Sequence, residues 1–113
     1  MRIIGKNLYM IRGDSETVTL MFTDSDKNLI PIANGDTLYF TVKKNIRDTE
    51  KILQKVLTDF PGGKAIIEIH SSDTSLLSPG KYVYDIQLTK SSGSVTTLIP
   101  PSDFILEGDV TRE

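Results

Sequence analysis

Residues Asp73 to Leu88, DTSLLSPGKYVYDIQL, are the stretch of this chain that decides its fold. The turn Ser78-Pro79-Gly80 comes directly before a segment of strict alternation. Tyrosine, tyrosine, isoleucine and leucine at positions 82, 84, 86 and 88 share one face, and residues 83, 85, 87 and 89 share the other. This period of two predicts a β-strand with one face in a hydrophobic core.

The turn and the strand together have the form Leu-x-x-Gly-x-Tyr. This form is typical of the tyrosine corner of immunoglobulin-like sandwiches, in which a tyrosine hydroxyl bonds back to the connection before its strand. We therefore expect Tyr82 to be buried, with its hydroxyl bonded to backbone between Asp73 and Ser78. Gly80 is expected to shape the chain's approach to that tyrosine.

Similar period-2 segments recur along the chain, with turn residues between them. They comprise residues 8–11, 17–23, 37–43, 64–70, 81–90, 95–99 and 104–106. In three of them the residues expected inward are Val18, Leu20 and Phe22, then Leu38, Phe40 and Val42, then Ala65, Ile67 and Ile69. The pattern predicts an all-β fold, an immunoglobulin-like antiparallel β-sandwich of about seven to eight strands, as a single domain over residues 1–113. The polar residues 107–113 are expected to fray.

One segment, DTEKILQKVL at residues 48–57, fits two structures. Asp48 suits a helix N-cap, and apolar residues at positions 52, 53, 56 and 57 have helical spacing. As a strand, the segment puts residues 52 and 56 on one face and residues 53 and 57 on the other. We favour the strand because a β connection fits the neighbouring segments, and a short helix between sheets stays open.

The composition excludes several classes of protein. Lys and Arg number 13 against 15 Asp and Glu, so no basic surplus exists for nucleic-acid binding. The chain has no cysteine, which removes disulfides and thiolate metal sites. No apolar run is long enough for a transmembrane helix, and Gly5, Lys6 and Asn7 interrupt the first apolar residues too early for a signal peptide. We expect synthesis in the cytoplasm and no membrane insertion.

Two short motifs resemble functional sites, one catalytic and one calcium-binding, and each lacks part of the required pattern. His70 is the only histidine and precedes two serines and Asp73, but no nucleophile-elbow pattern surrounds it. Asp24, Asp26 and Asn28 match the first ligands of an EF-hand loop, whereas the sixth and twelfth positions are leucine and glycine. The sequence therefore predicts no catalytic residue, no metal and no cofactor, and a protein that is not an enzyme.

Two further features concern partners. Arg12-Gly13-Asp14 spells an integrin-type tripeptide, which we interpret as the end of a strand and a turn. Tyr39, Thr41 and Lys43 alternate with the three inward residues of segment 37–43 and so face outward. Tyrosine is enriched in interface hot spots, so we predict a partner interface at these residues, with a solvated sheet face as the alternative.

Four segments carry a family resemblance by their order and spacing. They are RGDSETVTLMFTDSDKNLIPI (12–32), DTLYFTVKKNIRDTEKILQK (36–55), GGKAIIEIHSSDTSLLSPGKYVYDIQL (62–88) and DFILEGDVTR (103–112). Together they resemble the N-terminal domain family of phage baseplate upper proteins. The resemblance implies an immunoglobulin-like sandwich that packs against other baseplate proteins of a tail tip and holds receptor-binding parts in place. Members often continue into a longer chain, whereas this sequence ends at Glu113, which leaves fibre attachment by its own C-terminus open.

The expected function is therefore that of a non-enzymatic assembly module in a phage or prophage particle. Its expected partners are other tail and baseplate proteins, its expected location is the virion, and self-association between copies stays open. The alternative is a cell-surface adhesion or glycan-binding immunoglobulin-like module, which the absence of a signal peptide and of tryptophan disfavours. A small hydrolase is disfavoured because no nucleophile is paired with a base.

Overall fold

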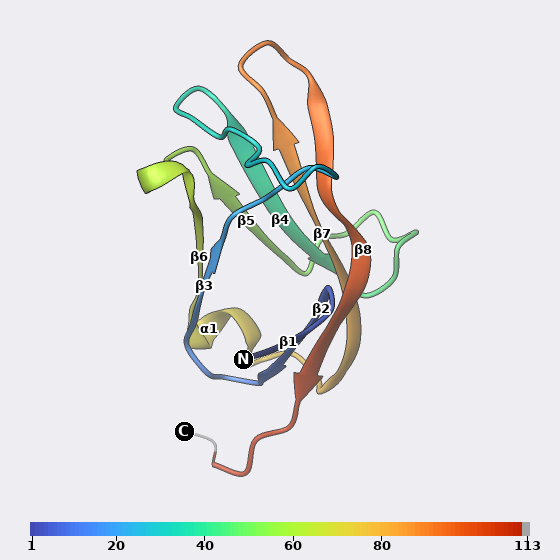
Figure 1. Ribbon diagram of the computed structural model, residues 1–113. Helices are drawn as coiled ribbons and strands as arrows, with labels where there is room; N and C mark the ends of the chain where they lie inside the picture. Colours follow the sequence, from blue (N-terminus) through green and yellow to red (C-terminus); the bar gives the residue numbers. More distant parts are fainter. Residues whose placement is uncertain (112–113) are drawn as a thin grey trace.

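The computed structural model describes residues 1–111 as β-strands joined by turns and by two short helical segments (Figure 1). The strands are β1 Arg2–Ile4, β2 Asn7–Ile11, β3 Glu16–Leu20, β4 Thr37–Lys43, β5 Leu53–Leu57, β6 Ala65–Ile69, β7 Gly80–Thr89 and β8 Val95–Glu107. A 3-10 turn spans Pro61–Gly63, and a single α-helical turn, α1, spans Ser71–Thr74.

The strands of residues 1–111 form two sheets. Six strands make one sheet in the order β1-β2-β8-β7-β4-β5, and β3 pairs with β6 in the second (Figure 1). The buried side chains of the two sheets meet in one core. Their largest fully buried members are Phe40, Phe104, Met10, Leu38, Ile67, Ile69, Ile86, Leu88, Leu106 and Val42. The predicted all-β sandwich of seven to eight strands is thus confirmed.

One strand pair corrects the prediction of an antiparallel sandwich. Strand β2 pairs with β8 in parallel, from Leu8 opposite Phe104 to Ile11 opposite Glu107, so the larger sheet is mixed. Nearly the whole chain separates these two strands. No tight turn therefore forces them to run in opposite directions, as a hairpin would.

Strand β8 joins two segments that the sequence pattern separates, residues 95–99 and 104–106. It passes through Pro100 and Pro101, which have no N–H for a ladder hydrogen bond. The register against β7 shifts here, because Tyr84 pairs with Ser102 and Ile86 with Ile99. One extra residue of β8 is therefore accommodated in a bulge, the position at which a sheet tolerates proline.

The N-terminal hairpin of β1 and β2 was not predicted. Arg2 pairs with Tyr9 and Ile4 with Asn7, so a two-residue turn connects the strands. Gly5 in that turn has a φ of 62°, a left-handed conformation that glycine adopts without steric cost. Since all three residues of β1 are exposed, no alternation of buried and exposed side chains marks the strand.

The ambiguous segment 48–57 contains a strand, which confirms the favoured interpretation over a helix. Strand β5 pairs antiparallel with β4, from Leu38 opposite Leu57 to Val42 opposite Leu53. Segment 17–23 is shorter than expected. Strand β3 ends at Leu20, although Phe22 still lies in the core.

The end of the chain is more firmly held than the sequence suggests. The expectation of a frayed tail is wrong for Glu107, which belongs to β8, and for Asp109, which pairs with the Arg12 guanidinium at 2.8 Å. Residues 112–113 lie outside the described part of the chain. The turn at Gly13, which precedes β3, is also held by a hydrogen bond, because the Gly13 N–H donates to the buried Thr74 hydroxyl at 2.9 Å.

Candidate functional site

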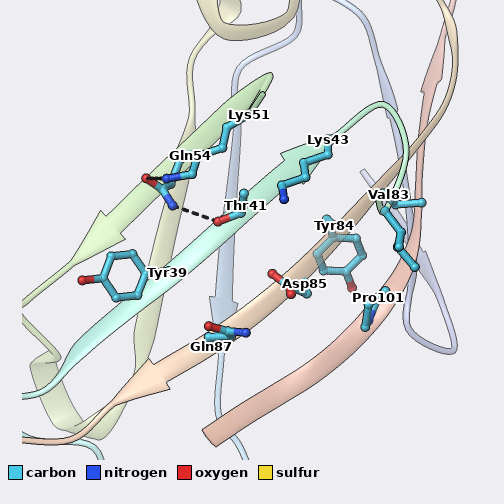
Figure 2. A pocket seen from close by; sticks show the side chains of 11 residues that line it. Tyr39, Thr41, Lys43, Lys51, Gln54, Val83, Tyr84, Asp85, Gln87 and Pro101 are labelled. Atoms are coloured by element: carbon cyan, nitrogen blue, oxygen red, sulfur yellow. Dashed lines mark hydrogen bonds between the residues drawn. The ribbon is translucent and has the colours of Figure 1, made fainter. Parts of the chain in front are cut away.

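A groove of about 420 Å³ crosses the outer face of the six-stranded sheet, over β4, β5 and β7. Eight of its lining residues carry a polar group, and three, Ile46, Val83 and Pro101, are apolar. Its lining residues are Tyr39, Thr41, Lys43, Ile46, Lys51, Gln54, Val83, Tyr84, Asp85, Gln87 and Pro101. We call this feature the sheet groove (Figure 2).

The three residues predicted to face outward all line the sheet groove. Tyr39, Thr41 and Lys43 lie in a row along β4, as Figure 2 shows. Each is half-buried, and the residues between them are fully buried in the core. The predicted alternation is therefore confirmed, while the role of this row in binding stays a prediction.

Neighbouring strands place polar side chains on both sides of this row. On the β5 side, the Gln54 amide donates to the Thr41 hydroxyl at 3.0 Å, and Lys51 donates to the Gln54 carbonyl oxygen at 3.5 Å. On the β7 side, Asp85 lies opposite Thr41 and Gln87 lies opposite Tyr39. These contacts link Lys51, Gln54 and Thr41 in one chain of hydrogen bonds along the groove.

Asp85 is the acidic residue of the groove. Burial raises the pKa of its carboxyl above the usual value, and the positive charge of Lys43 partly opposes that shift. Within residues 1–111 the carboxylate forms no hydrogen bond and no ion pair within 4.0 Å. Its oxygens can therefore accept hydrogen bonds from an incoming group.

The sequence pattern did not single out Gln54, Asp85 and Gln87. The alternation of β7 puts residues 85 and 87 on its outer face, so the sequence does predict that these two side chains point outward. To predict that they lie beside the β4 row, one must also know that β7 and β5 flank β4. That strand order is set by contacts between residues distant in the chain, and single-strand patterns do not encode it.

The expected hydrogen bond at the tyrosine corner is present on the other side of the sheet. Tyr82 is buried, and its hydroxyl donates to the Ser78 carbonyl at 2.6 Å. Gly80 has a φ of 151°, a backbone conformation that side chains rarely permit. The ammonium of Lys44 lies 4.6 Å from the centre of the Tyr82 ring, a cation–π contact. This corner anchors the start of the strand that carries Asp85.

The remaining motifs have local structural roles. The Asp24 carboxylate accepts hydrogen bonds from the amides of Asp26 and Asn28, at 2.9 and 3.0 Å, which is the hydrogen-bond pattern of an Asx turn. The His70 amide donates to Asp73 at 2.7 Å, and Asp73 also pairs with Lys55. No group of three or more histidines, cysteines or acidic residues within residues 1–111 is arranged to hold a metal ion.

Arg12 of the Arg-Gly-Asp tripeptide is engaged within the protein. Its side chain donates to Asp109 and to the Leu77 carbonyl, and only 18% of it is exposed. That leaves little of the guanidinium for an outside receptor. None of the helical segments described is long and apolar enough to cross a membrane.

Comparison with protein-family models, with curated proteins and with solved structures finds no match for this chain. The fold and the sheet groove define the class of protein: an all-β sandwich with a groove of mixed polar and apolar lining on the outer face of its larger sheet.

Proposed function

We propose that this chain is a structural, non-enzymatic component of a tailed-phage or prophage baseplate, and that it joins other tail proteins through the sheet groove. The order of the RGDS, YFTVKK and LSPGKYVYDIQL segments supports the particle assignment by resemblance. We also propose, from the same resemblance, that the sandwich is of the immunoglobulin-like kind. The virion is the proposed location.

The sheet groove is the observation that carries the assembly role. It combines a half-buried tyrosine ring with an acidic side chain and two lysines, and of these four residues all but Lys51 lie on strands β4 and β7. Protein interfaces are enriched in tyrosine and commonly set such a ring among polar groups. The paired strands beneath the groove would lose little conformational freedom on binding, which favours affinity.

Capture of particle proteins tests this proposal. Tagged wild type and Tyr39→Ala are each incubated with a lysate that contains the phage particle, and captured proteins are identified by mass spectrometry. Wild type should recover tail or baseplate proteins, and Tyr39→Ala should lose most of that recovery, since a hot-spot truncation costs about 2 kcal/mol or more.

Tyr9→Ala is the matched control. Tyr9 is also a half-buried tyrosine on the six-stranded sheet, but it lies on β2 and does not line the groove. Equal recovery of tail proteins by all three chains would contradict the proposed interface.

The groove also supports a second candidate, a glycan-binding module. An aromatic ring beside two amides, a hydroxyl and a carboxylate can stack on a sugar and exchange hydrogen bonds with its hydroxyl groups. Binding of wild type to an oligosaccharide array, lost in both Tyr39→Ala and Asp85→Ala, would favour this function over protein assembly.

A further inference from the structure

Strand β3 has hydrogen-bonding capacity that the fold does not use. Among residues 1–111 it pairs only with β6, from Glu16 opposite Ile69 to Leu20 opposite Ala65. In an antiparallel pair, every second residue points its N–H and C=O away from its partner. No backbone hydrogen bond joins β3 to any other segment of residues 1–111. One edge of β3 therefore has no strand paired with it in residues 1–111, although the N-terminal ammonium of Met1 binds the Glu16 side chain at 3.1 Å.

An apolar cleft of about 110 Å³ opens beside this edge. Its walls come from both sheets, and the larger sheet contributes its β1–β2 hairpin. The lining residues are Ile3, Gly5, Lys6, Leu8, Val18, Leu20, Phe40, Ile67, Ile69, Tyr84, Ile86 and Ile99. We call it the β3 cleft.

Exposure of the lining residues locates the mouth of the β3 cleft. Ile3 is 53% exposed, Gly5 and Lys6 are exposed, and Leu20 is only partly buried. The deeper residues, Phe40 among them, are fully buried. No residue of β5, the edge strand that contacts β6, lines the cleft. The mouth therefore lies on the unpaired side of β3.

The chemistry of the β3 cleft selects an apolar occupant. The Tyr84 hydroxyl is already bonded to the Lys6 carbonyl, and most other lining side chains are aliphatic. Such a cavity offers water few hydrogen-bond partners. An engineered apolar cavity of roughly 150 Å³ in another protein takes up benzene instead. A volume of about 110 Å³ fits one branched aliphatic side chain, and it is too small for a long acyl chain.

We propose that the β3 cleft is a second docking site, in which an extended strand of a partner protein pairs with the free edge of β3 and inserts one leucine or isoleucine side chain. Strand β3 itself alternates the exposed Thr17 and Thr19 with the core-facing Val18 and Leu20. A strand added beside it must follow the same alternation, so the partner segment has an apolar anchor between outward polar residues. This site shares Tyr84 with the sheet groove but neither Tyr39 nor Asp85, and it does not depend on the proposed function.

Peptide binding followed by NMR tests the proposal. The probe is the short peptide Lys-Thr-Thr-Leu-Thr-Thr-Lys, and the matched peptide has serine in place of leucine. The leucine peptide should shift the amide signals of residues 16–20 and the methyl signals of Val18, Leu20 and Ile99. The serine peptide should bind at least tenfold more weakly, because only the aliphatic side chain gains by leaving water.

Two neighbouring residues of β1 provide matched variants. Ile3→Glu places a charge at the mouth of the cleft and should weaken binding of the leucine peptide at least tenfold. Ile4→Glu should leave it unchanged, since Ile4 is 57% exposed but does not line the cleft. No signal change at millimolar peptide, equal affinity for the two peptides, or shifts confined to the sheet groove would overturn the proposal. The two peptides decide the question even if a variant fails to fold.

Discussion

The Tyr82 hydroxyl donates a hydrogen bond of 2.6 Å to the carbonyl of Ser78, and this bond closes the turn that leads into β7. Gly80, between the two residues, has a φ of 151° and so permits the approach. The same strand carries Asp85 and Gln87 on its opposite face. The corner thus fixes the strand that forms one side of the sheet groove.

Tyr82→Phe should destabilise the protein by about 1–3 kcal/mol, because it leaves the Ser78 carbonyl without its donor. Urea unfolding of both proteins measures the difference in the free energy of unfolding. Tyr9→Phe is the control, because its ring, 5.1 Å from the Arg2 guanidinium, is retained and its hydroxyl makes no hydrogen bond within residues 1–111. Equal stability of Tyr82→Phe and wild type would show that the corner contributes nothing.

Tyr84 should make the free energy of unfolding fall at alkaline pH. Burial raises the pKa of its hydroxyl from 10.0 to about 12. The unfolded chain therefore loses this proton at lower pH than the folded chain does. The contribution of the Tyr84 hydroxyl to the free energy of unfolding is fully present below about pH 10 and is lost as the pH rises toward 12. Urea unfolding across this range should show a steeper decline for wild type than for Tyr84→Phe, and identical slopes would refute the assignment.

Asp36 should produce the opposite dependence at acid pH. A hydrogen bond from the Lys90 ammonium, at 2.8 Å, holds the pKa of the Asp36 carboxyl below its usual value of 3.8. As the pH falls below about 3.8, the unfolded chain takes up this proton first, so stability declines. Thermal unfolding between neutral and acid pH should show a shallower decline for Asp36→Asn than for wild type. Asp26→Asn, at an exposed turn, should keep the wild-type profile.

Alternation in the sequence predicts those strands that bury one complete face. Strands β4 and β7 are of this kind, because every second residue, such as Leu38 or Ile86, has almost no contact with water. Strand β1 is exposed throughout, so the chain carries no such pattern there. The continuation of β8 through Pro100 depends on a bulge against β7, which a single-strand pattern does not reveal.

The sheet groove was predictable only in part, for the same reason. Tyr39, Thr41 and Lys43 face outward by the alternation of β4 alone. Their neighbours Gln54 and Asp85 come from strands 13 residues later and more than 40 residues later in the chain. Only strand order and register bring them together, and these arise from packing of the whole core.

Site-specific crosslinking tests the proposed role of the sheet groove most directly. A photo-crosslinking amino acid replaces Tyr39 in one variant and Tyr9 in another, and each is irradiated in cells that are assembling particles. Position 39 should crosslink to a tail or baseplate protein, and position 9 should give that product weakly or not at all. Crosslinks to tail proteins from neither position, or equally from both, would contradict an assembly interface at the sheet groove.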